Sequence, residues 1–139
     1  MSAAPADGWS EGQPPGPEAY VALRAACGLG ARTVEAAERG LRASLHCVTL
    51  REGGAVVAMA RIVGDGGCFA QLVDVMVRPD RQGRGLGDEA VRRALGWAEA
   101  NLPATCLVGL HCVPEMAPFH AVRGFRPLAG MVLNVGAAR

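Results

Sequence analysis

The most informative segment of the chain is Val73-Asp-Val-Met-Val-Arg-Pro-Asp-Arg-Gln-Gly-Arg-Gly-Leu-Gly-Asp88. It begins as a strand, breaks at Pro79, and passes through three alternating glycines into a helical pattern that starts near Leu86. Glycines let the backbone curl so that several N–H groups point to one spot, and a helix N-terminus adds its own free N–H groups. The segment therefore predicts an anion site suited to a pyrophosphate, to which Arg81 and Arg84 could add charge-assisted bonds. A tight turn without a ligand is the alternative.

Two other kinds of glycine-rich phosphate loop do not fit this segment. A P-loop requires G-K-[ST], and the chain has no lysine. A dinucleotide-binding fold places its glycines after the first strand, with a ribose-binding acid about 20 residues further on. Here the glycines follow three strands that we expect to be antiparallel, and the next expected strand, 106–113, contains no acidic residue.

Composition narrows the class of protein. The chain has 139 residues, half of them hydrophobic, which is enough for one domain with a real core. The formal net charge of +1 and the aromatic content of 4% argue against a nucleic-acid-binding protein. All 14 positively charged residues are arginine, which excludes any mechanism that uses a catalytic lysine.

The cysteines and histidines predict no metal site. None of the five cysteines forms a C-x-x-C pair, and the three histidines add no zinc-ligand spacing. The N-terminal residues lack the basic and apolar regions of a signal peptide, and we see no apolar stretch long enough to cross a bilayer. We therefore expect a cytoplasmic protein with reduced, mostly buried thiols and no membrane or nucleic-acid partner.

The hydrophobic pattern predicts one domain, 17–139, behind a flexible lead-in, 1–16, that is rich in proline and glycine. Short apolar runs separated by Gly-rich turns predict an antiparallel meander over 46–78. The expected helices are 17–27, 34–45, 86–101 and 115–123, and the expected strands are 46–51, 55–63, 68–78, 106–113, 125–128 and 130–135.

These features resemble one known superfamily. Gln82-Gly-Arg-Gly-Leu-Gly87 matches the Q/R-x-x-G-x-G/A pattern of the GNAT acyltransferases, and Pro118-Phe-His-Ala-Val-Arg-Gly-Phe125 is similar to a later segment of the same superfamily. The resemblance extends over about residues 17–135 and includes the order of the elements. It implies an α/β (α+β) fold: a mixed, mostly antiparallel sheet of about six to seven strands, flanked by about four helices and splayed at the fourth strand.

The resemblance also implies acetyl-CoA as the co-substrate. In this superfamily the pyrophosphate rests on the backbone amides of the glycine loop, and the pantetheine arm pairs with the fourth strand like an added strand. The positions of this chain that match are Val75 and Val77 on the strand, Gln82, Gly83, Arg84, Gly85, Leu86 and Gly87 in the loop, and Phe119 in the later segment. Val75 and Val77 can equally be buried strand residues.

The implied reaction is direct transfer of an acetyl group to a primary amine, which needs a base, an oxyanion donor and an acid. The donor is expected to be the N–H of Met76 or Val77. His120 stands where the superfamily often has a tyrosine acid, and a histidine could act there as acid or base. Asp74 or Glu115 could act as base through water. A surface histidine without a role, and a structural acceptor at Asp74, are the alternatives.

The acceptor is expected to be an amine of a small molecule or a peptide, and nothing in the sequence specifies it. A second hypothesis is an acyl-CoA-binding regulatory module that has lost turnover, because His120 replaces the usual tyrosine. Apolar residues in the last expected strand, Met131, Val132, Leu133 and Val135, suit a homodimer interface or a core.

Overall fold

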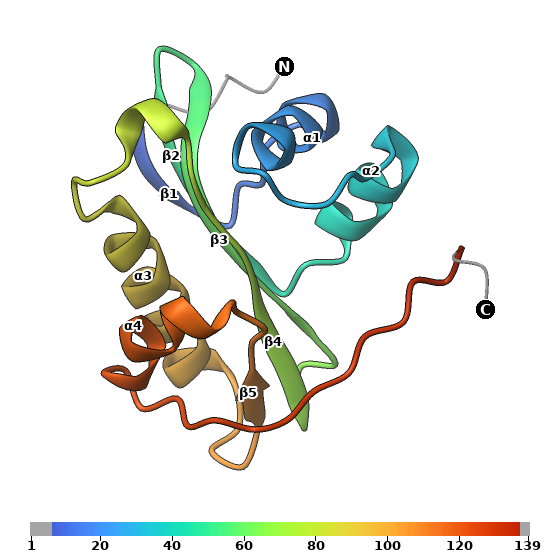
Figure 1. The fold of residues 1–139 in the computed structure, drawn as a ribbon, viewed down its shortest axis with the longest axis vertical. Helices are drawn as coiled ribbons and strands as arrows, with labels where there is room; N and C mark the ends of the chain where they lie inside the picture. The colour runs from blue at the N-terminus through green and yellow to red at the C-terminus, as the bar shows by residue number, and fades with distance from the viewer. Residues whose placement is uncertain (1–6, 137–139) are drawn as a thin grey trace.

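The structure, a computed structural model, describes residues 7–136. Within that range one five-stranded sheet has the order β1-β2-β3-β4-β5, with α1 and α2 on one face and α3 on the other (Figure 1). The strands are β1 Gly8–Glu11, β2 His46–Glu52, β3 Ala55–Gly64, β4 Phe69–Val77 and β5 Leu107–Gly109. The helices are α1 Pro17–Ala26, α2 Val34–Arg42, α3 Leu86–Asn101 and α4 Ala117–Ala121. The predicted fold class and the predicted meander are confirmed.

Local sequence signals explain where the first two helices begin. Pro17 opens α1 at a position that needs no backbone N–H, and Glu18 lies near the positive end of the helix dipole. Thr33 caps α2, because its hydroxyl accepts a hydrogen bond from the Ala36 N–H at 3.1 Å. Glu35 adds an acidic side chain in the first turn of α2.

The two faces of the sheet carry separate apolar clusters. Toward α3 the sheet packs Val48, Ile62 and Leu72 against Val91 and Ala94 of the helix. Toward α1 and α2 a second cluster is formed by Tyr20, Leu23, Ala37, Leu41, Cys47, Met59 and Met76. Burial on both faces is why β3 reads as a nearly continuous apolar run.

A β-bulge interrupts β4 in its middle. The register sets Met59 opposite Met76 and Arg61 opposite Val73, so β4 has one residue more than β3 in this stretch. Asp74 is part of the extra length and has φ of 55°, the only non-glycine residue with a positive φ among residues 7–136. A bulge bends a strand and redirects its side chains.

The bulge determines which way Asp74 faces. Ala70 and Leu72 pack toward α3, and simple alternation would point Asp74 the same way. Instead Asp74 contacts α1, and Met76 joins the α1–α2 cluster, whereas Val75 packs toward α3. Asp74 and Met76 therefore share one face of β4, and Val75 lies on the other.

The sheet splays between β4 and β5. In the described chain their parallel pairing runs from Phe69↔Leu107 to Gln71↔Gly109, and the remainder of β4, through Val77, extends past the end of β5. This leaves the edge of β4 open next to the glycine loop. The resemblance predicted a splay at the superfamily's fourth strand, which carries Val75 and Val77. This strand is β4, and the splay is confirmed.

Two terminal segments differ from the predictions. The lead-in 1–16 was expected to be flexible, but residues 8–11 form β1 and pair with β2 from Gly8↔Arg51 to Glu11↔Val48; residues 1–6 lie outside the described range. The expected strands 125–128 and 130–135 are extended chain without a ladder, and the strand expected over 106–113 is paired only at 107–109. An apolar alternation reports a preference for extended backbone, but a strand also needs a partner strand, which is a tertiary property.

Candidate functional site

The turn after β4 presents unpaired backbone N–H groups. A 3₁₀ turn at Pro79–Arg81 leads to Gly83 and Gly85, whose φ values are 81° and 76°. Gly85 is the N-cap of α3 and offers no side-chain cap, and the first helical bond runs from the Glu89 N–H to the Gly85 carbonyl at 3.1 Å. The N–H groups of residues 86–88 therefore have no acceptor within the helix, which makes this end of α3 suited to an anion.

The glycines keep this helix end open. A Cβ on Gly83 or Gly85 would meet no atom within 4 Å, so the space beside the loop is empty, while their positive φ disfavours any other residue. Gly87 has a different role, because a Cβ there would lie 3.6 Å from Val77 Cγ2, where α3 passes close to β4. The glycine spacing thus serves both the shape of the loop and the packing of the helix.

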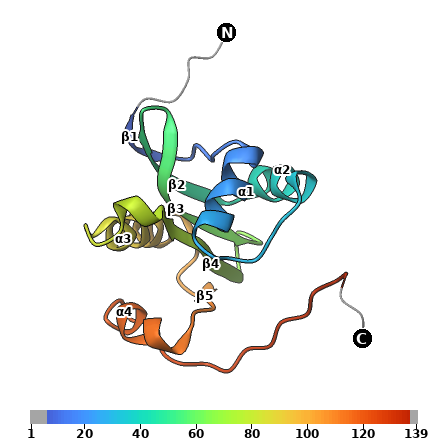
Figure 2. The same cartoon turned by 45° about the horizontal axis from the view of Figure 1, so that its top comes forward.

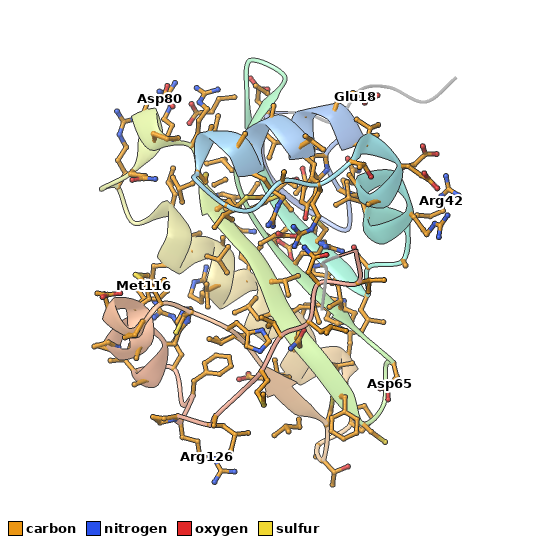
Figure 3. The ribbon with its side chains drawn as sticks, turned by 45° about the vertical axis from the view of Figure 1, so that its right-hand side comes forward. Glu18, Arg42, Asp65, Asp80, Met116 and Arg126 are labelled. Carbon is orange, nitrogen blue, oxygen red and sulfur yellow. The ribbon has the colours of Figure 1, made fainter. Side chains whose placement is uncertain are left out.

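The arginines around the loop are not equally available. Arg78 and Arg81 both bind Asp80, at 2.6 and 2.9 Å, and the bond from Arg78 lowers the pKa of Asp80. Arg81 also donates to Glu52 at 2.7 Å. Its guanidinium is therefore already bound to two carboxylates and is less available for the expected contact with a phosphate. Arg84 makes no hydrogen bond or ion pair with any other residue that the structure describes. Figure 3 shows Asp80 at the turn after β4, with Asp65 at the other end of the strand.

The open edge of β4 is only partly free to accept a strand-like ligand. The Val77 carbonyl accepts a hydrogen bond from Gln82 Nε2 at 3.0 Å and from the Cys27 thiol at 3.4 Å. Pairing at that carbonyl would require the Gln82 amide to move aside. Val75 lies beyond the end of β5 and has no such competitor, so the expected backbone pairing is better supported at Val75.

Asp74 is the centre of a buried charged group. Its carboxylate accepts from Tyr20 Oη at 2.7 Å, from Arg24 Nη1 at 2.6 Å and from Arg61 Nε at 2.9 Å, and its side chain is 3% exposed. Burial, followed by the bond to Asp74, raises the pKa of Tyr20. We call Tyr20, Arg24, Arg61 and Asp74 the Asp74 cluster. A carboxylate whose oxygens already accept three bonds is poorly placed to take a proton from a substrate, so the geometry favours the structural alternative for Asp74 over a base.

No pattern in the sequence predicts this cluster. Its members come from α1, β3 and the bulge in β4, and only the fold brings them together. Of its four members, only Asp74 stood out in the sequence as a candidate site residue. A bulge at a non-glycine residue leaves no pattern in a single sequence.

His120 is buried between two aromatic rings. It packs edge-on against Phe119 and Phe125, with ring centroids at 5.0 and 5.9 Å. Its Nδ1 is sealed from solvent and has no hydrogen-bond partner, alone among the buried side-chain polar atoms of residues 7–136. Burial lowers the pKa of the imidazole, so its neutral form is favoured. The alternative of a surface histidine is wrong.

Arg123 fixes the segment that carries His120. Its guanidinium bonds to the Phe119 carbonyl, stacks over the Phe119 ring at 4.0 Å, and forms an ion pair with Asp88 in the first turn of α3. This brings Phe119 to the α3 side of the sheet. Figure 2 shows α4, the helix of His120, well away from α1. Asp74 contacts α1, so the two residues do not form a catalytic pair.

The burial of His120 predicts a pH dependence of stability. Because its folded-state pKa is lowered, the unfolded chain binds the proton more tightly, and stability is lost as pH falls from about 6.5 toward the folded-state pKa. In chemical unfolding between pH 7 and pH 5, His120→Gln should lose less stability than the wild type. His111→Gln, at an exposed histidine, is the matched control. Equal losses in the wild type and His120→Gln would contradict the prediction.

The cysteines and acids form no metal centre in the described part of the chain, where no three His, Cys, Asp or Glu side chains cluster. The expectation of mostly buried thiols is wrong: all five cysteines are free, but only Cys47 is buried, and burial raises its pKa to about 12.

A cavity of about 370 Å³ lies between the C-terminal half of α3, β5 and the turn at Gly124. No helix among residues 7–136 has the length and apolarity to cross a bilayer.

A family model described as "Acetyltransferase (GNAT) family" matches residues 13–125. The match includes β4, the glycine loop, α3 and the segment of His120. A search of the curated proteins finds no match.

Solved structures with the same fold are similar to nearly the whole chain. A Staphylococcus aureus protein of unknown function, described as a probable acetyltransferase, is 29% identical with a TM-score of 0.83, over 91% of this chain and 98% of that one. A GNAT-family acetyltransferase from Streptococcus pneumoniae is 25% identical with a TM-score of 0.73, over 93% and 98%. A predicted acetyltransferase from Clostridium acetobutylicum with acetyl-CoA is 15% identical with a TM-score of 0.67, over 92% and 96%, which shows the fold alone.

Proposed function

Because the chain belongs to the GNAT acetyltransferase family, we propose that it moves an acetyl group from acetyl-CoA directly to a primary amine of a small molecule or peptide. The observation that carries this proposal is the open edge of β4, which leads straight to the uncapped N-terminus of α3. The edge suits the extended pantetheine arm, and the helix end suits the pyrophosphate.

The residues around the loop fit the co-substrate. The backbone N–H groups of residues 83–87 would hold the pyrophosphate, in the space that the missing Cβ atoms of Gly83 and Gly85 leave open; the N–H of Gln82 already donates to the Pro79 carbonyl. Arg84 would add a charge-assisted bond. Val75 would pair with the pantetheine arm, and Phe119, held by Arg123, would line the α3 side.

The proposed reaction is the direct transfer of the acetyl group from the thioester to the amine. A neutral amine attacks the thioester carbonyl, the oxygen gains negative charge, and the C–S bond then breaks to release the thiolate of coenzyme A. We propose that the N–H of Met76 or Val77 stabilises the oxyanion. Asp74 is not part of this proposal as a base, because its carboxylate is committed to Tyr20, Arg24 and Arg61.

His120 is proposed to accept a proton rather than donate one. An acid must carry the proton that it gives away, and burial makes the protonated imidazole scarcer at neutral pH. The neutral ring can take a proton from the incoming ammonium through water at Nε2, because Nδ1 is sealed from solvent. His120→Gln should then lower kcat while leaving acetyl-CoA affinity unchanged.

Release of free coenzyme A thiol, measured with a panel of amines, tests the proposal. The second hypothesis, a module that binds acyl-CoA without turnover, is favoured by one observation, the histidine at the usual tyrosine position. It predicts acetyl-CoA binding with no thiol release for any amine.

The five free cysteines support a reducing compartment, and we propose the cytoplasm.

We also propose that the chain forms a homodimer through its C-terminal segment. The side chains of Leu128, Met131, Val132, Leu133 and Val135 are 67–98% exposed, which is costly for a lone molecule. In the described chain the outer edge of β5 has no partner strand, and the apolar wall of the nearby cavity includes Val108 and Phe125. The segment of one copy would add to β5 of the other.

The dimer proposal predicts an outcome in solution. Light scattering after gel filtration should give twice the mass of 14.4 kDa for the wild type. The double variant Met131→Asp, Leu133→Asp should run as a monomer, since charges cannot pack in an apolar interface. Asn134→Asp, a charge at a polar position of the same segment, should remain a dimer. A monomeric wild type would rule the dimer out.

A further inference from the structure

The Asp74 cluster has more positive than negative charge. Arg24 and Arg61 share the single carboxylate of Asp74, and their side chains are only 10% and 12% exposed. Buried charges are normally paired, because an unpaired charge loses its hydration without compensation. One of the two guanidinium charges is therefore left without a counter-charge within the cluster.

Both arginines also have an N–H group, at Nη2, that makes no hydrogen bond to the described part of the protein. Arg24 uses Nε on the Gly30 carbonyl and Nη1 on Asp74, and Arg61 uses Nε on Asp74 and Nη1 on the Gly40 carbonyl and Ser44. Within residues 7–136 neither Nη2 donates to a protein acceptor. Neither is sealed, because His120 Nδ1 is the one buried unpaired side-chain atom in that range. The two Nη2 groups thus still reach solvent from an otherwise buried site.

A third guanidinium lies nearby on the loop between α1 and α2. A Cβ built on Gly30 would lie 3.5 Å from Arg32 Nη1 and 3.9 Å from Arg24 Nη2, so the two side chains flank the same glycine. Arg32 is exposed and bonds only to the neighbouring Ala31 carbonyl among the described residues. It stands at the surface beside the less exposed Arg24.

The location of this surplus charge bears on the acceptor. Asp74 and Met76 share the α1–α2 face of β4, and the backbone at Met76 is where the proposed reaction takes place. The non-reacting part of an acceptor that approaches from this face would meet Arg24 and Arg61. A planar carboxylate matches a pair of guanidinium N–H groups in shape and charge.

We propose that the acceptor is an amino carboxylate, whose carboxylate is bound by Nη2 of Arg24 and Arg61 with Arg32 at the entrance. The proposal rests on the proposed acetyltransferase function and names its substrate class. The bound carboxylate supplies the counter-charge that the cluster lacks.

The test uses a series of amino carboxylates of increasing chain length, from glycine to aminohexanoate. Each is compared with the compound in which an uncharged amide replaces the carboxylate. Rates of coenzyme A release are expressed per concentration of neutral amine, so that differences in amine pKa do not enter. At the best chain length the carboxylate should have a kcat/KM at least about tenfold above that of its amide, mainly through KM. Equal values for every pair, with turnover present, would overturn the inference and leave the acetyltransferase function standing.

Substitutions of single arginines test which of them causes the preference for the carboxylate over the amide. Arg24→Gln leaves a neutral Asp74–Arg61 pair, so it removes the surplus charge and should abolish the preference. Arg32→Gln, at an exposed position that is safe for folding, should reduce the preference about threefold. Arg39→Gln, at an arginine of α2 that is 81% exposed, is the matched control and should change nothing. If Arg24→Gln does not fold, an unchanged preference in Arg32→Gln overturns the entrance role.

A binding measurement separates the two proposals. Calorimetry with the N-acetylated carboxylate and its amide does not depend on turnover. Tighter binding of the carboxylate without any thiol release would keep the anion subsite and reject the enzyme. Aminoethyl phosphate is a final arm, and a clear preference for it over β-alanine would replace the carboxylate with a phosphate and overturn the proposed class.

Discussion

Gly85→Glu should abolish acetyl-CoA binding. The substitution puts a carboxylate beside the free N–H groups at the start of α3, where the pyrophosphate would lie, and forces a residue with a Cβ into φ of 76°. We expect calorimetry to show an affinity at least about 100-fold weaker, or ~2.7 kcal/mol. Gly85→Ala, which has the strain without the charge, should fall in between.

The matched control lies on the same helix. Gly96→Glu makes the same chemical change in the interior of α3, where a Cβ would meet no atom within 4 Å. It stands 11 residues further along, or about 16 Å along the helix axis. Its affinity should equal that of the wild type. If both variants bind equally well, the loop is not the cradle; if the wild type itself does not bind, the proposed function fails and the family and fold remain.

Asp74→Ala should be the most destabilising single change at the site. It removes one carboxylate and leaves the buried guanidinium groups of Arg24 and Arg61 without a counter-charge, and it frees the Tyr20 hydroxyl. Breaking a buried ion pair on one side typically costs about 3–5 kcal/mol, which for a chain of this size is a fall in Tm of roughly 10 °C or more. Thermal unfolding followed by circular dichroism measures this directly.

Asp80→Ala is the control for that prediction. Asp80 also binds two arginines, Arg78 and Arg81, but at the surface, where its side chain is 55% exposed. Solvent already screens these pairs, so Tm should barely change. A fall in Tm for Asp74→Ala no larger than that for Asp80→Ala would show that the Asp74 cluster does not hold α1 to the sheet.

The local signals in the sequence were enough to predict the elements that depend on neighbours in the chain. The glycines at 83, 85 and 87 and the apolar periodicity of 86–101 act over a few residues, and each was found where it was expected. The meander over 46–78 was equally readable, because its turns are short and rich in glycine. Strand boundaries near the chain ends were not, because β1 and the segment after Gly124 depend on whether a distant edge pairs with them.

The sequence by itself therefore determined the order of the elements from α1 to α4 and the loop that would receive a pyrophosphate, since both follow from backbone preferences that act locally. The tertiary structure alone decided the face of Asp74, its union with Tyr20, Arg24 and Arg61, and the burial of His120 beside α3. The physical reason is that a side chain's charge partners and its hydration are set by residues 13 to 54 positions away, which a local pattern cannot encode.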